Sequence, residues 1–274
     1  MERHAIRVFP RRTSYTPWDA MAFVGDPPLI RPEAEEVHVS VSFTWDIEEG
    51  YRLQQAWSQY YSKVLLGGPA MGSPSEDFVA GRYVKEGVTF TTRGCNLKCP
   101  WCLVPQREGM LQLRPIVPGW IVQDNNLLQA PRAHLDAVFE MLDRQLRAAI
   151  FAGGLQASLV DDWFANRLQG MRVESVFMAA DTRPALKSLA KAVEKLAFLG
   201  RRKLRCYVLI GFNGESPSEA SARLEAVWEI GAMPFAQLYQ PPDGYVEYGS
   251  DWKALARKWS RPAAMMAMHK VEEL

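Results

Sequence analysis

Apolar and polar residues alternate along several short stretches of this chain, in the pattern typical of half-buried strands. The first stretch, VHVSVSFTW at 37–45, alternates valines with polar residues, and a second apolar run, KVLLGG, follows at 63–68. Between the two, apolar residues recur at helical spacing over 53–60, and Asp46 and Glu49 before them have the spacing of a capping box. The pattern predicts a βαβ unit.

Six further apolar stretches begin at residue 87, and amphipathic segments separate most of them. Helices are predicted around 135–146, 186–196 and 220–228, the last opened by a capping box at 216–219. Strands that alternate with helices indicate a parallel sheet, and six strands are too few for a closed eight-stranded barrel. The predicted fold class is therefore α/β, a partial (β/α)6 barrel with an N-terminal βαβ extension. Its strands are predicted at 87–92, 119–124, 148–152, 174–180, 204–211 and 233–239.

Four segments follow from this pattern. Residues 1–36 are punctuated by prolines and lack sustained periodicity, so they are predicted to form an extended N-terminal arm. A βαβ-like extension and connector then covers 37–86, and the partial barrel covers 87–240. Residues 241–274 are predicted to form a helical closure, in which Met265, Met266 and Met268 pack rather than react.

Composition narrows the class of protein. The 274 residues are 48% hydrophobic and carry a formal net charge of +1, which provides no overall field to attract nucleic acid. Positive charge gathers locally at the N-terminus, in a segment best explained as a solvated arm. No apolar run approaches the roughly 20 residues that span a bilayer, and no secretion signal is visible, so a cytoplasmic location is expected. The N-terminal cluster consists of Arg3, Arg7, Arg11 and Arg12.

Three of the four cysteines, Cys95, Cys99 and Cys102, lie within the short segment RGCNLKCPWCLVP, just after the first strand of the predicted barrel. A structural zinc site needs four ligands, but Cys206 lies far away inside a predicted strand and every histidine is distant in sequence. A four-iron cluster held by three thiolates would instead leave one iron free to bind a cofactor or substrate. A catalytic cluster is favoured, and a zinc-stabilised α/β binding module is the alternative.

The spacing C-x₃-C-x₂-C, with Trp101 before the last cysteine, resembles that of the radical S-adenosylmethionine (SAM) enzymes over roughly residues 87–240. The resemblance implies a [4Fe–4S] cluster on Cys95, Cys99 and Cys102, whose unique iron binds SAM. It implies reductive cleavage of SAM to a 5′-deoxyadenosyl radical that abstracts hydrogen from a substrate. It also implies an electron donor such as flavodoxin or ferredoxin.

The same resemblance assigns cofactor contacts at the ends of later strands. Asp124 or Asn125 would hold the methionyl amine, although the segment Gln-Asp-Asn-Asn replaces the commoner Gly-Gly-Glu and a plain turn is the alternative. Asp181 would touch the ribose or carboxylate, or would cap a helix. Gly211 and Phe212 would pack against adenine and Trp101 would lie near it; a strand-to-helix turn and a loop hydrophobe are the alternatives.

Other positions bear on the substrate. Arg107 and Arg114 follow the cysteines closely, so a guanidinium there could hold a carboxylate or phosphate, or could be a solvated loop charge. Gly153 and Gly154 could admit substrate to the backbone or make a turn. The near-neutral charge favours a small-molecule or nucleotide-like substrate over a nucleobase or peptide side chain within a polymer.

The segment 37–70, with the GGPAM sequence at its end, resembles a remnant of the cobalamin-binding domain that precedes some radical SAM enzymes. The chain before it is too short for a full domain, and no Asp-x-His-x-x-Gly motif is present; His4 and His38 lie in the wrong context. No cobalamin is therefore expected.

Overall fold

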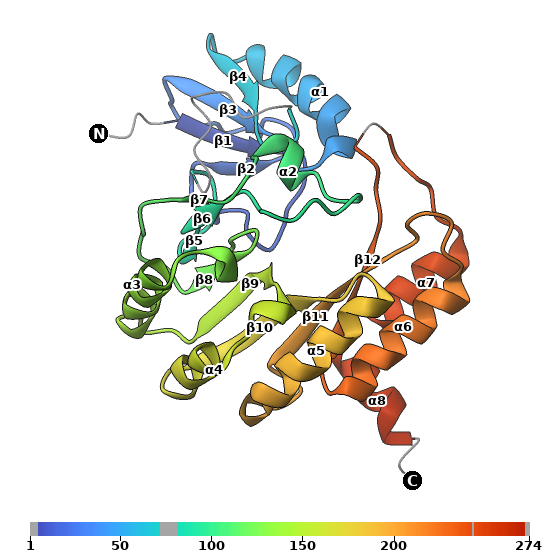
Figure 1. Ribbon diagram of the computed structural model, residues 1–274. Coiled ribbons are helices and arrows are strands. Elements are labelled where there is room, and N and C mark those ends of the chain that lie inside the picture. Colours follow the sequence, from blue (N-terminus) through green and yellow to red (C-terminus); the bar gives the residue numbers. More distant parts are fainter. Residues whose placement is uncertain (1–4, 72–81, 243, 272–274) are drawn as a thin grey trace. The chain divides into compact units, whose positions relative to one another are not determined.

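The computed structural model describes residues 5–71, 82–242 and 244–271 (Figure 1). The chain divides into two compact units, one formed by residues 1–88 with 242–245 and the other by 89–241 with 246–274. Each unit contains its own parallel sheet and its own buried apolar cluster. The coarse α/β class predicted from the sequence is therefore confirmed. No helix in the described part of the chain has the length and apolar character needed to cross a membrane.

Unit 1 is a four-stranded sheet in the order β2-β1-β3-β4, in which all neighbours run parallel. The predicted βαβ unit corresponds to β3, α1 and β4, and α1 buries Leu53 and Trp57 against the valines of β3. The bounds are β1 Ala5–Phe9, β2 Ala22–Val24, β3 Glu36–Ser40, a 3₁₀ turn at Thr44–Asp46, α1 Ile47–Ser58 and β4 Val64–Gly67.

The extended arm predicted for residues 1–36 is wrong over β1 and β2. β1 lies inside the sheet, and its Ile6 and Val8 are fully buried. These strands are only five and three residues long and are separated by prolines, so their alternation is too short to stand out from a loop. Arg3 and His4 lie outside the described residues.

The charges near the N-terminus of α1 also differ from the prediction. Asp46 precedes the helix but makes no capping hydrogen bond; its Oδ2 instead accepts from Arg11 Nε at 2.6 Å. Glu49 pairs with Arg52 at 2.7 Å. The predicted capping box is wrong because both carboxylates bind guanidinium groups, which form stronger hydrogen bonds than a backbone N–H.

The remaining described N-terminal arginines are engaged within unit 1. Arg7 forms an ion pair with Asp19. The guanidinium of Arg12 stacks over the Trp18 ring at 4.3 Å. The predicted solvated arm therefore forms contacts that help to hold the unit together.

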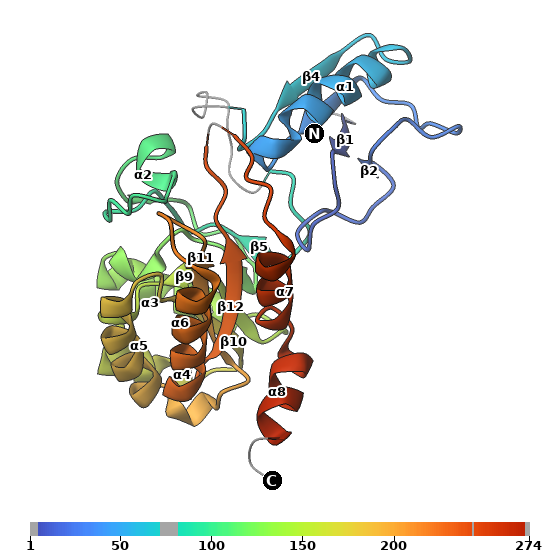
Figure 2. The same ribbon diagram turned by 90° about the vertical axis from the view of Figure 1, so that its right-hand side faces the viewer.

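Unit 2 contains a six-stranded sheet whose order, β12-β11-β10-β9-β8-β5, follows the chain. The pairs from β8 to β12 are parallel, and Figures 1 and 2 show α3, α4, α5 and α6 along one side of this sheet. The strands are β5 Val88–Thr89, β8 Ile121–Val122, β9 Ala149–Leu155, β10 Val173–Ala179, β11 Leu204–Ile210 and β12 Met233–Leu238. The helices are α3 Arg132–Asp143, α4 Asp162–Gln169, α5 Arg183–Lys195 and α6 Pro217–Ile230, with 3₁₀ turns at Leu127–Gln129, Ala157–Leu159 and Ala197–Leu199.

The strand predicted at 87–92 divides into β5 and the short β6, Thr92–Arg93, which pairs antiparallel with β7, Gln112–Leu113. The cysteine segment and α2, Val104–Arg107, lie between β6 and β7. The first barrel strand therefore ends in a small hairpin whose connection carries the three cysteines.

Several finer expectations are confirmed in unit 2. Cys206 is completely buried in the middle of β11. Ser216 and Glu219 form the reciprocal capping box at the start of α6, which ends at Gly231 in the left-handed conformation. The C-terminal segment forms α7, Ser250–Lys258, and α8, Pro262–Val271, and Met265 packs into the core as predicted.

Candidate functional site

The cysteine segment is held in place by a single carboxylate. Glu108 forms an ion pair with Arg93, and its Oε2 accepts hydrogen bonds from the Gly94 backbone at 3.1 Å and from Asn125 Nδ2 at 2.7 Å. The Cys95 N–H donates to the Gly109 carbonyl at 3.1 Å. The position of the loop is therefore fixed by groups on both sides of the cysteines.

Cys95, Cys99 and Cys102 are free thiols of intermediate exposure. Burial raises the pKa of the Cys99 and Cys102 thiols, and the neighbouring Cys95 and Asp181 raise it further. The Cys99 and Cys102 thiols therefore lie in surroundings that disfavour additional negative charge. A positively charged metal group would reverse this balance and stabilise all three thiolates.

Cys95 also receives hydrogen bonds to its sulfur. The backbone N–H of Leu97 lies 3.5 Å from the Cys95 Sγ, and Asn126 Nδ2 lies 3.8 Å from it. Such donors stabilise a thiolate and are a means by which proteins tune iron–sulfur clusters. Among the residues that the structure describes, no group of three or more His, Cys, Asp or Glu is arranged to hold a metal ion.

Amide side chains surround Cys95 on the side that follows β8 and β9. Gln156 Oε1 accepts from both Asn126 Nδ2 and Gln129 Nε2 at 3.1 Å, and Gln129 Oε1 accepts from the Asn96 backbone at 2.8 Å. Asn126 is almost fully buried, and its Oδ1 has no partner within the described residues. We call the following residues the amide half of the site: Asn96, Asp124, Asn126, Gln129 and Gln156. Sequence reasoning missed the amide contacts, although Gln156 directly follows β9 and Asn126 lies four residues after β8.

Asp124 has a different position from the one predicted for a cofactor contact. It is 2% exposed, and its two oxygens accept from the Thr91 N–H at 2.6 Å and the Thr91 hydroxyl at 2.5 Å. Burial raises the pKa of its carboxyl, and these hydrogen bonds offset the rise only partly. Asp124 thus ties β8 to the segment between β5 and β6, while Asn125 reaches Glu108.

Gly153 explains how closely the strands approach each other here. A Cβ atom on this residue would lie 1.6 Å from the Asp124 carbonyl oxygen. Position 153 therefore has to be glycine because of the backbone at Asp124, just after β8, and not because a substrate approaches it.

The second side of the site follows β10, β11 and β12 and is built mainly of rings. Trp101 and Phe212 meet edge to face at a centroid distance of 5.6 Å, and Phe212 meets Tyr239 in the same way at 4.9 Å. Asp181 Oδ1 accepts from the Leu209 N–H at 2.8 Å. We call these four residues (Trp101, Asp181, Phe212 and Tyr239) the aromatic half. The structure thus brings together Trp101, Asp181 and Phe212, which were predicted separately.

Asp181 is the titratable group of the aromatic half. Burial raises the pKa of its carboxyl, and this outweighs the opposing effects of the Leu209 N–H, the charge of Arg223 and a hydrogen bond from the Trp101 side chain. Helix α5 has Thr182 as its N-cap, so Asp181 does not serve as the cap that was considered as an alternative. A carboxylate in these surroundings favours a cationic or hydrogen-bond-donating partner.

Gly211 adjoins this half and is held in position by Glu215 and by Tyr248, of which sequence reasoning missed Tyr248. Its φ is +81°, and a Cβ would lie 2.8 Å from the Tyr248 ring. Its N–H donates to Glu215 Oε2 at 3.0 Å, and Glu215 forms a buried ion pair with Arg223, 7% exposed. Glu215 therefore supports the end of β11.

The two predicted substrate arginines differ in exposure. Arg114 is exposed, and its backbone N–H donates to the Thr91 carbonyl at 2.9 Å. Arg107 ends α2 and is half-buried. Their role in binding an anion stays a prediction.

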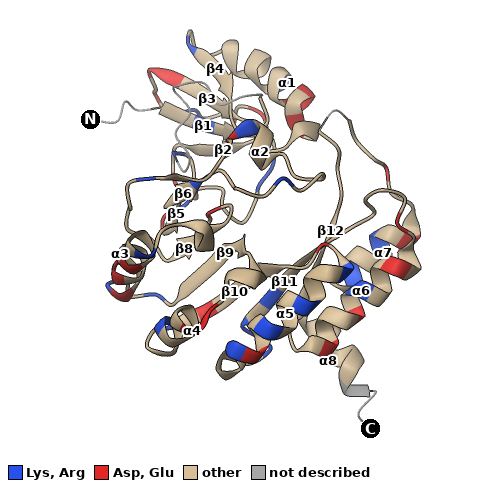
Figure 3. Ribbon diagram, in the orientation of Figure 1, with Lys and Arg blue, Asp and Glu red and all other residues tan. Residues whose placement is uncertain are grey.

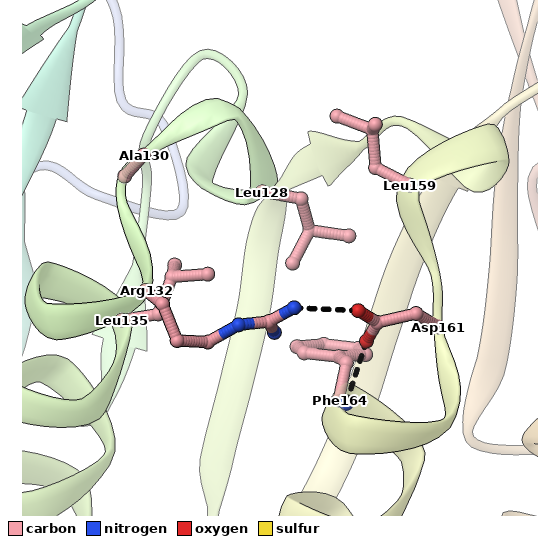
Figure 4. Close-up of a pocket in the computed structure, with 7 residues that line it drawn as sticks. All are labelled: Leu128, Ala130, Arg132, Leu135, Leu159, Asp161 and Phe164. Atoms are coloured by element: carbon pink, nitrogen blue, oxygen red, sulfur yellow. Dashed lines mark hydrogen bonds and ion pairs between the residues drawn. The ribbon is translucent and has the colours of Figure 1, made fainter.

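A separate cavity of about 330 Å³ lies between the start of α3 and the start of α4 (Figure 4). Arg132 crosses it to Asp161 with an Nη2–Oδ2 distance of 2.6 Å and stacks over Trp163 at 3.9 Å. Asp161 also caps α4 through the Phe164 N–H at 2.9 Å. Both charges are therefore matched inside the cavity, which contains none of the predicted site residues.

Comparisons of this chain with protein-family models, with curated proteins and with solved structures find no match.

Proposed function

We propose that this protein is a radical SAM enzyme with one [4Fe–4S] cluster on Cys95, Cys99 and Cys102. The observation that carries the proposal is that Trp101, from the cysteine segment, contacts Phe212 and Asp181, which follow β11 and β10 at the carboxyl ends of neighbouring parallel strands. In such sheets the loops at these strand ends carry the chemistry. The chain order of the strands and the helices on one side support a partial (β/α)6 barrel.

The donor set has the chemistry that the proposed cluster and cofactor require, although the three thiols are not gathered around a common metal position in this structure. Three thiols of intermediate exposure supply the ligands, N–H groups donate to the Cys95 sulfur, and the buried Asn126 Oδ1 provides an acceptor close by. When bound, the cluster and SAM supply one-electron chemistry: reductive cleavage of SAM and abstraction of hydrogen from a substrate. A reduced flavodoxin or ferredoxin would deliver the electron, and the free thiols suit a reducing cytoplasm.

The protein's own side chains then have distinct tasks. Trp101 and Phe212 offer ring faces and edges for an adenine, and Asp181 accepts hydrogen bonds from a ribose or an amine. Asp124, Asn125 and Glu108 keep the cysteine loop in position through hydrogen bonds that are already satisfied within the protein. The cofactor-binding assignment is therefore strongest for the aromatic half.

Anaerobic reconstitution with iron and sulfide tests the proposal. We expect brown protein whose absorbance bleaches on reduction with dithionite, and release of 5′-deoxyadenosine from SAM. Cys99→Ala should abolish both, whereas Cys206→Ala should retain both because Cys206 lies in the core. Colourless protein that retains stoichiometric zinc would favour the binding-module alternative, and cluster-loaded protein that leaves SAM intact would refute the enzyme.

A further inference from the structure

Positive charge is concentrated in one segment of a chain whose net charge is only +1. Residues 183–205 contain eight Lys and Arg against a single acidic residue, Glu194. They form α5, the 3₁₀ turn Ala197–Leu199 and the start of β11. Figure 3 shows basic positions repeated along α5. The near-neutral total therefore conceals a strongly basic surface in unit 2.

The basic residues of α5 form a ridge. Arg183, Lys187, Lys191 and Lys195 recur every four residues, which places them along one side of the helix over roughly 18 Å. Lys195 forms an ion pair with Asp162, and the charge of Arg183 acts on Glu219.

The ridge continues into the loop before β11. Arg202 and Lys203 are exposed there, as Lys187 and Lys191 are on the helix. In the described part of the chain, none of these four residues forms an ion pair with an acidic side chain. Four exposed cations without acidic partners within one segment favour a partner that carries several negative charges.

Apolar and aromatic groups interrupt this basic surface. Phe198 lies between Lys195 and Arg201 in sequence and is 45% exposed, although large apolar rings are usually covered. The residues that follow it in sequence line an open hollow of about 480 Å³, whose lining residues are Leu199, Gly200, Arg201, Arg202, Lys203 and Met266. Lysines and arginines interleaved with an exposed ring and a hollow are the features with which proteins bind single-stranded nucleic acid.

We infer that α5 and residues 197–203 form a binding surface for single-stranded nucleic acid. The phosphates contact Lys187, Lys191, Arg202 and Lys203, and a base stacks on Phe198. The surface begins at Arg183, two residues after Asp181 of the candidate site, and runs to the opposite end of the sheet. A bound strand would therefore lead toward the site, which favours the polymer alternative for the substrate.

Fluorescence anisotropy of a labelled 12-nucleotide single strand, RNA and DNA in parallel, tests this on the full-length protein between 50 and 200 mM KCl. We expect binding that weakens steeply with salt. Lys187→Gln with Lys191→Gln should weaken it at least tenfold and reduce the log–log salt slope by about 1.4, or 0.7 for each lost phosphate contact. Phe198→Ala should weaken it at least about fivefold, the lower end of the effect of losing one stacked base.

The control is Arg144→Gln with Arg257→Gln, which removes two exposed charges elsewhere and should change affinity less than twofold. No binding at 50 mM KCl, or equal effects of the two charge variants, would overturn the inference. A second result would also overturn it. In that result the protein binds polyphosphate, or vesicles containing phosphatidylserine, as tightly as the single strand, and Phe198→Ala leaves the binding unchanged. SAM cleavage measured on the same preparations keeps this outcome separate from that of the proposed enzyme activity.

Discussion

The two halves of the candidate site surround their aspartates with different groups. In the amide half, both oxygens of Asp124 are occupied by Thr91, and Gln156 binds Asn126 and Gln129. In the aromatic half, Asp181 accepts a backbone N–H through Oδ1 and a hydrogen bond from the Trp101 side chain. Under the proposed function, the amide half positions the cysteine loop and the aromatic half contacts the cofactor.

The largest expected effect comes from the amide half. Gly153→Ala would place a methyl group 1.6 Å from the Asp124 carbonyl oxygen, and neither strand can move without losing sheet hydrogen bonds. We expect a loss of more than about 3 kcal/mol in the free energy of unfolding, the upper end for overpacking. Urea denaturation followed by circular dichroism measures it.

Gly170→Ala is the matched control. A Cβ there would lie 3.8 Å from the nearest carbonyl oxygen, and φ at this residue is −83°. This variant should remain within about 1 kcal/mol of the original protein. Equal stability of the two variants would contradict the close approach of β8 and β9.

The second prediction compares Asp124 and Asp181 directly. Asp181→Asn removes a charge from the ligand side and should weaken SAM binding or cleavage about tenfold, equivalent to roughly 1.4 kcal/mol. Asp124→Asn keeps an acceptor for the Thr91 N–H and should change SAM binding less than threefold. Equilibrium dialysis with labelled SAM on reconstituted protein measures the affinity of both variants. A larger loss of affinity in Asp124→Asn than in Asp181→Asn would mean that the amide half contacts the ligand and the aromatic half does not.

The sequence predicted more of the aromatic half than of the amide half, for a physical reason. Strand ends and the C-x₃-C-x₂-C spacing are local patterns, and the family resemblance that rests on them implied cofactor contacts at Trp101, Asp181 and Phe212. The hydrogen bonds of Asp124 and Gln156 depend on which donor from another loop reaches each of their side-chain oxygens. Periodicity contains no information about that pairing.

The same limit applies to unit 1. Its βαβ unit was predicted because α1 has a continuous apolar face, whereas β1 was missed because five residues give too little alternation. The register that buries Ile6 and Val8 is set by β3, about 30 residues away. Long-range pairing decided the structure there, and local propensity did not.

A smaller effect is expected from the ring contacts of the aromatic half. Phe212→Leu keeps an apolar group but removes the edge-to-face contacts with Trp101 and Tyr239. Aromatic pairs contribute about 0.5–1.5 kcal/mol beyond their buried area, so SAM affinity should fall about 2- to 12-fold. Phe198→Leu, which changes a ring outside the site, is the control, and an equal loss in both variants would argue against a ligand beside Phe212.

The last prediction concerns the pH dependence of stability in the amide half. Because burial raises the pKa of Asp124, the folded protein binds this proton more tightly than the unfolded chain does. The stabilising contribution is complete below the ordinary aspartate pKa near 4 and is lost as the pH rises through the raised value. Asp124→Asn lacks this titration, so the stability of the original protein relative to the variant should fall as the pH rises. Paired urea titrations between pH 4 and 8 measure the difference, and a relative stability that increases with pH would show that the Thr91 hydrogen bonds outweigh burial.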